Sequence, residues 1–250
     1  MLLGSAAALF VAFVVIEARV AAPLMPLALF RLRNVAVANV AGVLWAASMF
    51  AWFFISALYM QRVLGYTPLK VGLGFLPANI VMALLSLGFS AKIVMRFGTR
   101  LPLAFGLLIA AGGLALFARA PVNGVFVIDM LPGMLLLGLG AGVALNPMLL
   151  AAMSDVSERD SGLASGVVNT AFMMGGALGL AVLASLAAAR TGTALAAGLP
   201  LAAADNTGYQ LALLVGAAFA AIAAVIGAVS MRTSAPQQPN RQETLHEPVR

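Results

Sequence analysis

The sequence predicts an all-α, polytopic membrane protein, and three observations lead to this fold class. Of the 250 residues, 63% are hydrophobic and only 9% are charged, whereas charged residues make up about 25% of an average soluble domain. The apolar residues form long runs separated by short polar segments, and they do not alternate with polar residues as in the strands of a membrane β-barrel. Because lipid cannot satisfy an open strand edge, the runs are expected to be helices.

Seven apolar runs are candidates for the membrane spans. A helix needs about 20 apolar residues to cross the hydrocarbon core. The first run, Leu2–Ile16, is short, and the other six are Val35–Met60, Val71–Ala91, Leu101–Ala118, Val125–Leu150, Leu163–Ala189 and Tyr209–Met231. The predicted organisation is a truncated transmembrane helix and cytoplasmic linker in residues 1–34, a six-helix bundle in residues 35–231 and a polar, disordered cytoplasmic tail in residues 232–250.

The basic residues between the runs predict the orientation. Ten lie in the connections after the first, third and fifth runs and in the tail: Arg19, Arg31, Arg33, Lys92, Arg96, Arg100, Arg159, Arg232, Arg241 and Arg250. The other connections hold only Arg62, Lys70, Arg119 and Arg190. Since basic residues gather on the cytoplasmic side, the C-terminus is expected in the cytoplasm and the protein in the cell (inner) membrane.

Composition also excludes several kinds of chemistry. The sequence has no cysteine and one histidine, His246, which lies in the polar tail. Disulfides, thiolate metal sites, histidine metal clusters and a Ser-His-Asp triad are therefore excluded. The basic residues are scattered singly, whereas a nucleic-acid-binding face needs a basic patch or stripe. We expect no enzyme activity, no metal, no cofactor and no nucleic-acid partner.

Three stretches carry a resemblance to a known family. Residues 58–72 read LYMQRVLGYTPLKVG, residues 160–166 read DSGLASG, and residues 169–179 read NTAFMMGGALG. In this order they resemble signatures of the fourteen-helix drug:proton antiporters of the major facilitator superfamily (the EmrB/QacA type). That family has two six-helix bundles with two extra helices between them. The resemblance implies that Leu2–Ile16 is the second extra helix, that the C-terminal bundle follows, and that the N-terminal bundle is absent from this sequence.

The resemblance also implies a function. It predicts the C-terminal half of a proton-coupled multidrug efflux antiporter, which sits in the lipid bilayer and exchanges small lipophilic or cationic drug-like solutes for protons. Such a half is expected to need the missing N-terminal half. The alternative is a membrane-inserted remnant without transport activity. No basic residue precedes Arg19, which disfavours a cleaved signal peptide.

A basic segment follows the third run. Residues 91–100 read AKIVMRFGTR and resemble the superfamily's cytoplasmic loop motif G-R-L-x-D-R-x-G-x-R. Lys92, Arg96 and Arg100 keep basic positions of the motif, Gly98 keeps its turn residue, and Met95 stands in place of its acid. The basic residues either anchor the helix ends or also latch a closed state by binding carboxylates.

Two pairs of glycines have the GxxxG spacing. Gly138 and Gly142 form one pair, and Gly175 and Gly179 form the other, which includes Gly176. Small residues four apart let two helix backbones approach closely in a membrane. These glycines serve ordinary helix packing, or they form a pivot surface for alternating access.

Polar residues inside the runs are candidates for a solute cavity. Asn146-Pro147 lies in the fifth run, where proline can kink the helix. Asn79 in the third run and Asn169 in the sixth are further cavity candidates. Phe172 and Met173 stand where the family has arginine and glutamine, which removes two polar groups from this span.

The second run holds a cluster of aromatic residues. They either form a cavity wall suited to flat, cationic solutes or face lipid and the membrane interface: Trp45, Phe50, Trp52, Phe53, Phe54 and Tyr59.

Acidic residues would carry proton coupling, but none is expected at mid-membrane. Asp129 comes closest, although an acid at a helix start is favoured by the helix dipole. Asp205 is expected in an external connection over residues 190–208. The resemblance places the family's coupling acids mostly in the N-terminal bundle.

Overall fold

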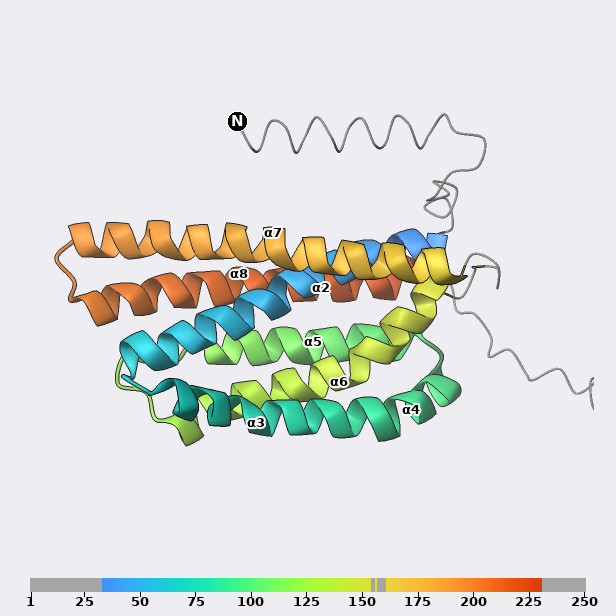
Figure 1. Cartoon of the computed structure of the whole chain (residues 1–250), viewed down its shortest axis with the longest axis horizontal. Helices are drawn as coiled ribbons and strands as arrows, with labels where there is room; N and C mark the ends of the chain where they lie inside the picture. The colour runs from blue at the N-terminus through green and yellow to red at the C-terminus, as the bar shows by residue number, and fades with distance from the viewer. Residues whose placement is uncertain (1–32, 154–155, 157–160, 231–250) are drawn as a thin grey trace, which may run out of the picture.

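The computed structural model describes residues 33–153, 156 and 161–230, and all regular secondary structure in these residues is helical (Figure 1). The helices, with their π-helical turns labelled η, are α2 (Arg33–Leu58), η2 (Tyr59–Val63), α3 (Pro68–Leu84), η3 (Leu85–Phe89), α4 (Ser90–Phe97), α5 (Arg100–Phe117), η4 (Phe126–Met130), α6 (Leu131–Met153), α7 (Ser161–Ala196) and α8 (Leu201–Ser230). The predicted helix Leu2–Ile16 and the predicted tail after Arg232 lie outside the described residues.

These elements join into six continuous spans. Within the described residues, six helices are long and apolar enough to cross a membrane: Arg33–Val63, Pro68–Phe97, Arg100–Phe117, Phe126–Met153, Ser161–Ala196 and Leu201–Ser230. The prediction of an all-α, multi-pass membrane protein is therefore confirmed, and each of the six longer apolar runs corresponds to one span. The helices extend beyond most of the predicted bounds because polar residues at their ends continue the helical hydrogen bonding.

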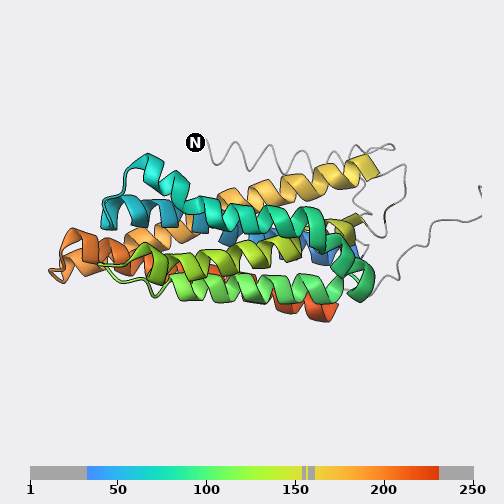
Figure 2. The ribbon, with the colours of Figure 1, turned by 90° about the horizontal axis from the view of Figure 1, so that it is seen from below.

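The spans form two layers. α5 and α8 lie side by side at the back of the bundle in Figure 1, and the view turned by 90° shows them again on one side (Figures 1 and 2). α2 and α6 cross in front of them, with α7 along one edge and α3 with α4 along the other (Figure 1). α6 contacts both α5 and α3, whereas α7 contacts α2 and α8.

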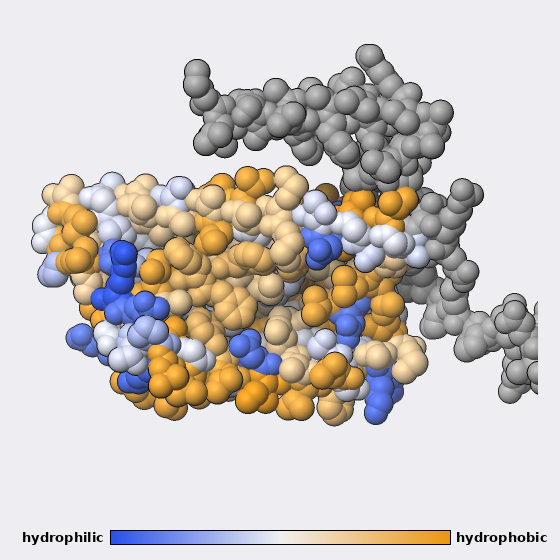
Figure 3. Space-filling view, in the orientation of Figure 1, coloured by the Kyte–Doolittle hydropathy of each residue, from blue (hydrophilic) through white to orange (hydrophobic). Residues whose placement is uncertain are grey.

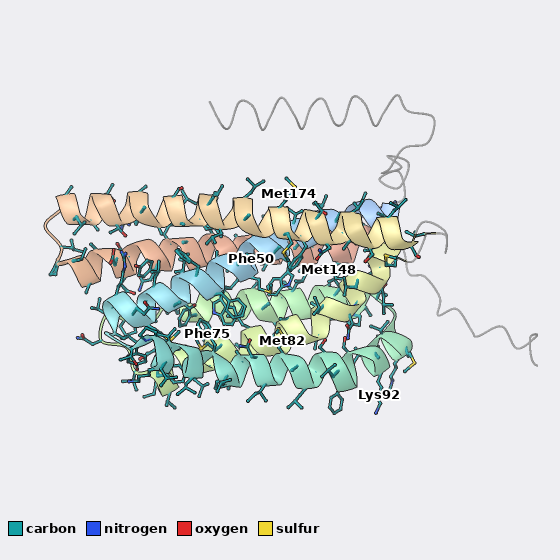
Figure 4. All side chains as sticks on the ribbon, viewed as in Figure 1. Phe50, Phe75, Met82, Lys92, Met148 and Met174 are labelled. Atoms are coloured by element: carbon teal, nitrogen blue, oxygen red, sulfur yellow. The ribbon has the colours of Figure 1, made fainter. Side chains whose placement is uncertain are left out.

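The two ends of the bundle are named here by one residue each. The Lys92 end holds Lys92, labelled in Figure 4, with the start of α2 and the end of α8. There the Arg33 Nε donates a hydrogen bond of 2.8 Å to the Ser230 carbonyl, which satisfies a terminal carbonyl of α8. The Pro121 end holds the connection between α5 and η4 and the turn between α7 and α8.

Two connections are shorter than the sequence predicted. Lys92 and Arg96 were expected in a loop, but both lie on α4, and only Gly98 and Thr99 separate α4 from α5. Gly98 has a φ of 73°, a left-handed conformation that glycine adopts without strain. The expected external connection over residues 190–208 is also wrong, because α7 continues to Ala196 and α8 begins at Leu201.

The interior of the bundle is built from a few large side chains among many small ones. Trp45, Ile55, Leu107, Leu114 and Phe117 are almost completely buried, and they are surrounded by buried alanines and glycines. Small residues allow helices to approach closely where lipid supplies no hydrophobic driving force between them. The face shown in Figure 3 is largely apolar, with polar residues gathered at the Pro121 end and in isolated patches elsewhere.

Candidate functional site

A cavity of about 480 Å³ lies between α2, α6 and α7. Its wall is mostly apolar and includes amide, hydroxyl and thioether groups: Ala38, Asn39, Gly42, Leu145, Met148, Leu149, Met153, Ser165, Val168, Asn169, Phe172 and Met173. No charged side chain is among these residues. A cavity of this size and polarity is typical of sites for small lipophilic molecules, and the methionines can adapt to different shapes.

Asparagines from two helices contribute polar groups to this wall. Asn169, a predicted cavity residue, lies on the exposed part of α7 and lines the cavity. Asn39 was missed by the sequence analysis, and its Nδ2 donates a 2.8 Å hydrogen bond to the Val35 carbonyl. Its Oδ1 has no hydrogen-bond partner in the described part of the chain. Asn39 could have been recognised as a polar amide side chain inside the predicted span Val35–Met60.

The other predicted cavity residues lie elsewhere. Asn79 lines a much smaller space, of about 10 Å³, beside Trp45 and Trp52. Asn146 and Pro147 line neither cavity. Pro147 is buried within α6, and the Asn146 Nδ2 donates a hydrogen bond of 2.7 Å to the Ser86 carbonyl in η3. The structure therefore places Asn146 at a contact between two helices.

The aromatic residues of α2 divide between the interior and the surface. Trp45 and Trp52 are buried, so for these two residues the alternative that they face lipid is wrong. The Trp52 ring lies 4.3 Å from the Phe53 ring and 5.6 Å from the Phe75 ring of α3, centroid to centroid. Phe54 is 45% exposed. Trp52 and Phe53 therefore pack α2 against Phe75 of α3, whereas the Phe50 ring contacts the Phe172 ring of α7. None of the six aromatic residues lines the larger cavity.

The predicted glycines on α7 contact α2. A Cβ built on Gly175 would lie 2.7 Å from the Val43 Cα, and one on Gly176 would lie 2.8 Å from the Phe50 ring. A Cβ on Gly179 would collide with Ala47. Contacts under about 3 Å leave no room for a side chain. The backbones of α2 and α7 can therefore pack this closely only with glycine at these three positions.

The other predicted pair contacts the span formed by α3 and η3. A Cβ on Gly138 would collide with the Ala78 carbonyl, and one on Gly142 would lie 2.8 Å from both the Met82 carbonyl oxygen and the Leu85 Cβ. Both predicted GxxxG pairs therefore lie where two helix backbones meet.

The sequence analysis missed four glycines at the interface of α5 and α6. A Cβ on Gly106 would lie 2.8 Å from the Gly140 carbonyl oxygen, and one on Gly113 would lie 2.7 Å from the Gly133 carbonyl oxygen. The reverse contacts are equally close, with 2.9 Å from a Cβ on Gly133 to the Gly113 carbonyl oxygen. The signal was a spacing of seven residues on each helix, which places both glycines on one face.

The basic residues of the predicted gating segment surround the turn between α4 and α5. Lys92 and Arg96 are exposed on α4, and Arg100 begins α5 after the Gly98 turn. The Arg96 guanidinium lies 5.5 Å from the centroid of the neighbouring Phe97 ring. All three cations thus lie at the Lys92 end, where they are available to headgroups or to a carboxylate of another segment.

Both acids that the structure describes lie at the Pro121 end. The Asp129 Oδ2 accepts a 2.6 Å hydrogen bond from the Val125 backbone amide, so its role at a helix start is confirmed. Asp205 is in the first turns of α8 and is buried, so its predicted place in a loop is wrong. The Tyr59 hydroxyl donates to the Pro121 carbonyl at 2.7 Å, and the Asn206 amide donates to the Ala120 carbonyl at 3.2 Å.

Comparison with known proteins gives the family. Residues 2–180 match the model of the Major Facilitator Superfamily. The chain is 37% identical to the cephamycin export protein of Amycolatopsis lactamdurans over 182 residues, which cover 72% of this chain and 37% of the relative. It is 33% identical to the puromycin resistance protein of Streptomyces alboniger over 211 residues, or 82% of this chain and 42% of the relative.

A third relative also has a name that refers to antibiotic resistance and export. The chain is 33% identical to the tetracenomycin C resistance and export protein of Streptomyces glaucescens over 190 residues, which cover 76% of this chain and 35% of that protein. Six apolar spans and these matches define a multi-pass membrane protein of a transporter class. The chain belongs to the Major Facilitator Superfamily, and it spans less than half the length of these relatives.

Proposed function

We propose that this chain is the C-terminal bundle of a proton-coupled multidrug efflux antiporter. The observation that carries the proposal is the cavity of about 480 Å³ between α2, α6 and α7, whose wall is apolar except for amide and hydroxyl groups. Three relatives with names that refer to antibiotic export or resistance support efflux of drug-like solutes. A small, lipophilic solute fits this wall, and a cationic solute finds the ring of Phe172.

Export on this proposal requires a second bundle, on the same polypeptide or on another one. Alternating access is a rocking of one bundle against another about a site between them. The relatives are more than twice as long as the segments that match this chain, which leaves room for such a bundle. The described acids, Asp129 and Asp205, both lie at the Pro121 end, so a coupling carboxylate at mid-membrane is assigned to the second bundle.

The Lys92 end is assigned to the cytoplasm of the cell (inner) membrane because the connections predicted on its side hold ten basic residues in the sequence, against four on the other side. Six of the ten lie outside the described residues, within which each side holds four. A reporter enzyme that is active only outside the cytoplasm, fused after Arg250, should then stay inactive. Activity of this reporter would reverse the orientation and would remove the basis for a gating role of Lys92, Arg96 and Arg100.

The transport proposal is tested with a fluorescent cationic dye in cells without efflux pumps of their own. Residues 1–250 alone should leave dye retention at the level of the empty vector, and co-expression of the matching N-terminal bundle of a relative should lower it. A proton uncoupler should restore retention. Retention that no second bundle lowers would favour the remnant without transport activity.

A cavity variant links the transport to the site. A Cβ on Gly42 would meet only the Met148 sulfur, at 3.5 Å, which is an ordinary contact. Gly42→Leu should therefore fill the cavity without displacing a backbone and should abolish dye export. The control is Gly72→Leu, because a Cβ on Gly72 has no neighbour within 4 Å. Equal export by both variants would contradict the assignment of the cavity.

A further inference from the structure

Two defects in regular helix geometry face each other in the bundle. In the span of α3 and α4, the π-helical turn η3 widens the backbone, and the Ser90 amide donates to the Leu85 carbonyl five residues earlier. In α6, Pro147 lies inside the helix. Both kinds of defect bend helices, and π-helical turns are frequent at functional positions.

Each defect leaves one carbonyl without its usual donor. When α4 returns to four-residue spacing after Ser90, the next amide pairs with residue 87, and the carbonyl of Ser86 is passed over. On α6, the missing amide hydrogen of Pro147 is the one that would bond to the carbonyl four residues earlier, that of Val143. An unpaired carbonyl is costly inside a membrane protein, so each needs a donor from elsewhere.

Each helix supplies the donor that the other lacks. The Asn146 Nδ2 on α6 donates to the Ser86 carbonyl at 2.7 Å. The Ser90 hydroxyl at the start of α4 donates to the Val143 carbonyl at 3.4 Å. Ser90 is buried and Asn146 is partly buried, so these bonds are shielded from water. The two bonds thus form a reciprocal pair between η3 and the Pro147 kink.

The pair lies directly before the basic segment. α4 begins at Ser90 and carries Lys92 and Arg96 to the turn at Gly98. Before the pair, α3 is held against α6 by the backbone contacts of Gly138 and Gly142. Along this span the glycine backbone contacts end and the two side-chain hydrogen bonds follow. The direction in which α4 leaves α3, and with it the position of Lys92 and Arg96, therefore depends on these two bonds.

We propose that Asn146 and Ser90 are positioning residues of a paired hinge, which fixes the direction of α4 and so places the basic segment at the Lys92 end. The inference rests on the proposed function and deepens it, because it assigns to the Asn146-Pro147 pair a role in positioning the predicted gating segment with Lys92 and Arg96. Its structural part concerns only this chain and does not depend on transport.

The test measures the direction of α4 in the full chain of 250 residues in lipid nanodiscs. The sequence has no cysteine, so introduced cysteines carry spin labels without background. Met95 on α4 and Val229 on α8 are both well exposed, and Met95→Cys with Val229→Cys reports the distance between these helices. Phe105→Cys on α5 with Val229→Cys provides a reference pair outside the hinge.

Asn146→Ala and Ser90→Ala should each shift and broaden the distance distribution of the α4 pair and leave the reference pair unchanged. Ser86→Ala should have no effect, because Ser86 contributes its backbone carbonyl and not its side chain. Pro147→Ala restores an amide donor to the Val143 carbonyl, so Ser90→Ala should lose its effect in that background. A general loss of packing would move both pairs together and would overturn the proposal.

An unchanged α4 distance in both Asn146→Ala and Ser90→Ala would also overturn it. The proposed function is read separately, from dye export with the second bundle present. Export by the unmodified chain together with an unchanged α4 distance in the variants would refute the hinge and leave the transport proposal standing. Absence of export together with a shifted α4 distance in the variants would refute the transport proposal and support the hinge.

Discussion

α6 packs against a helix on each of two sides, and the two sides are held by different chemistry. Toward α5, glycines bring the backbones together at two levels, where Gly106 meets Gly140 and Gly113 meets Gly133. Toward α3, close contact at Gly138 and Gly142 is followed by side-chain hydrogen bonds from Asn146 and Ser90. Both sides therefore have backbone contact, but the α3 side also depends on two hydrogen bonds, which can break and form again.

The surroundings of the two partners strengthen this contrast. In the most apolar stretch of each span, 50% of the α5 residues are buried, but only 22% of those in the span of α3 and α4. α5 is enclosed between α6 and α8, while the outer face of α3 exposes large apolar residues such as Leu73 and Leu84. The comparison suggests a fixed side and an adjustable side on one helix.

The largest effect is expected from a side chain on the fixed side. A Cβ on Gly140 would lie 2.5 Å from the Ala110 amide nitrogen, so Gly140→Ala should force α5 and α6 apart and cost about 3 kcal/mol of stability. The chain's two tryptophans, Trp45 and Trp52, are buried in the core, and their fluorescence can follow unfolding in micelles. Gly112→Ala is the control, because a Cβ there meets nothing within 4 Å.

A smaller effect is expected two residues further along α6, on the adjustable side. A Cβ on Gly142 would lie 2.8 Å from the Met82 carbonyl oxygen, but α3 can withdraw because no described helix covers its outer face. Gly142→Ala should therefore cost about 1 kcal/mol, measured in the same unfolding experiment. A cost equal to that of Gly140→Ala would mean that the two sides are equally rigid.

Arg96→Ala should have the smallest effect on stability, under about 0.5 kcal/mol, because its side chain is exposed. If the hinge places this cation for gating, the variant should still reduce dye export in the presence of the second bundle. Membrane insertion, followed by the amount of protein in the membrane fraction, should stay unchanged. Normal export would reduce the basic segment to an anchor of the helix ends.

The sequence was sufficient for the spans and for part of the packing. Six runs of about 20 apolar residues can hardly be anything except membrane helices, and the GxxxG spacing led directly to Gly138, Gly142, Gly175 and Gly179. The contact of α5 with α6 was missed because its glycines are seven residues apart on two different helices. Two glycines seven residues apart on a single helix do not indicate a contact. The contact can be recognised only when it is known that α5 packs against α6.

Other features depend on contacts that a sequence does not display. The connection over residues 190–208 contains Gly198 and Pro200 and was therefore interpreted as a loop, although four residues suffice for the turn. The π-helical turn η3 has no distinctive composition, and its partner Asn146 is 60 residues away. Asn146 was recognised as a polar residue in a span, but its role as a donor follows only from the position of the Ser86 carbonyl.

Hydrogen–deuterium exchange of the full chain in lipid nanodiscs tests most directly whether α6 has one fixed and one adjustable side. Amides of residues 103–114 in α5 and 133–144 in α6 should exchange slowly, since opening them requires the glycine contacts to separate. Amides of residues 86–97, in η3 and α4, should exchange measurably faster, and faster still in Asn146→Ala. Equal or slower exchange in residues 86–97 than in α5 would contradict the account.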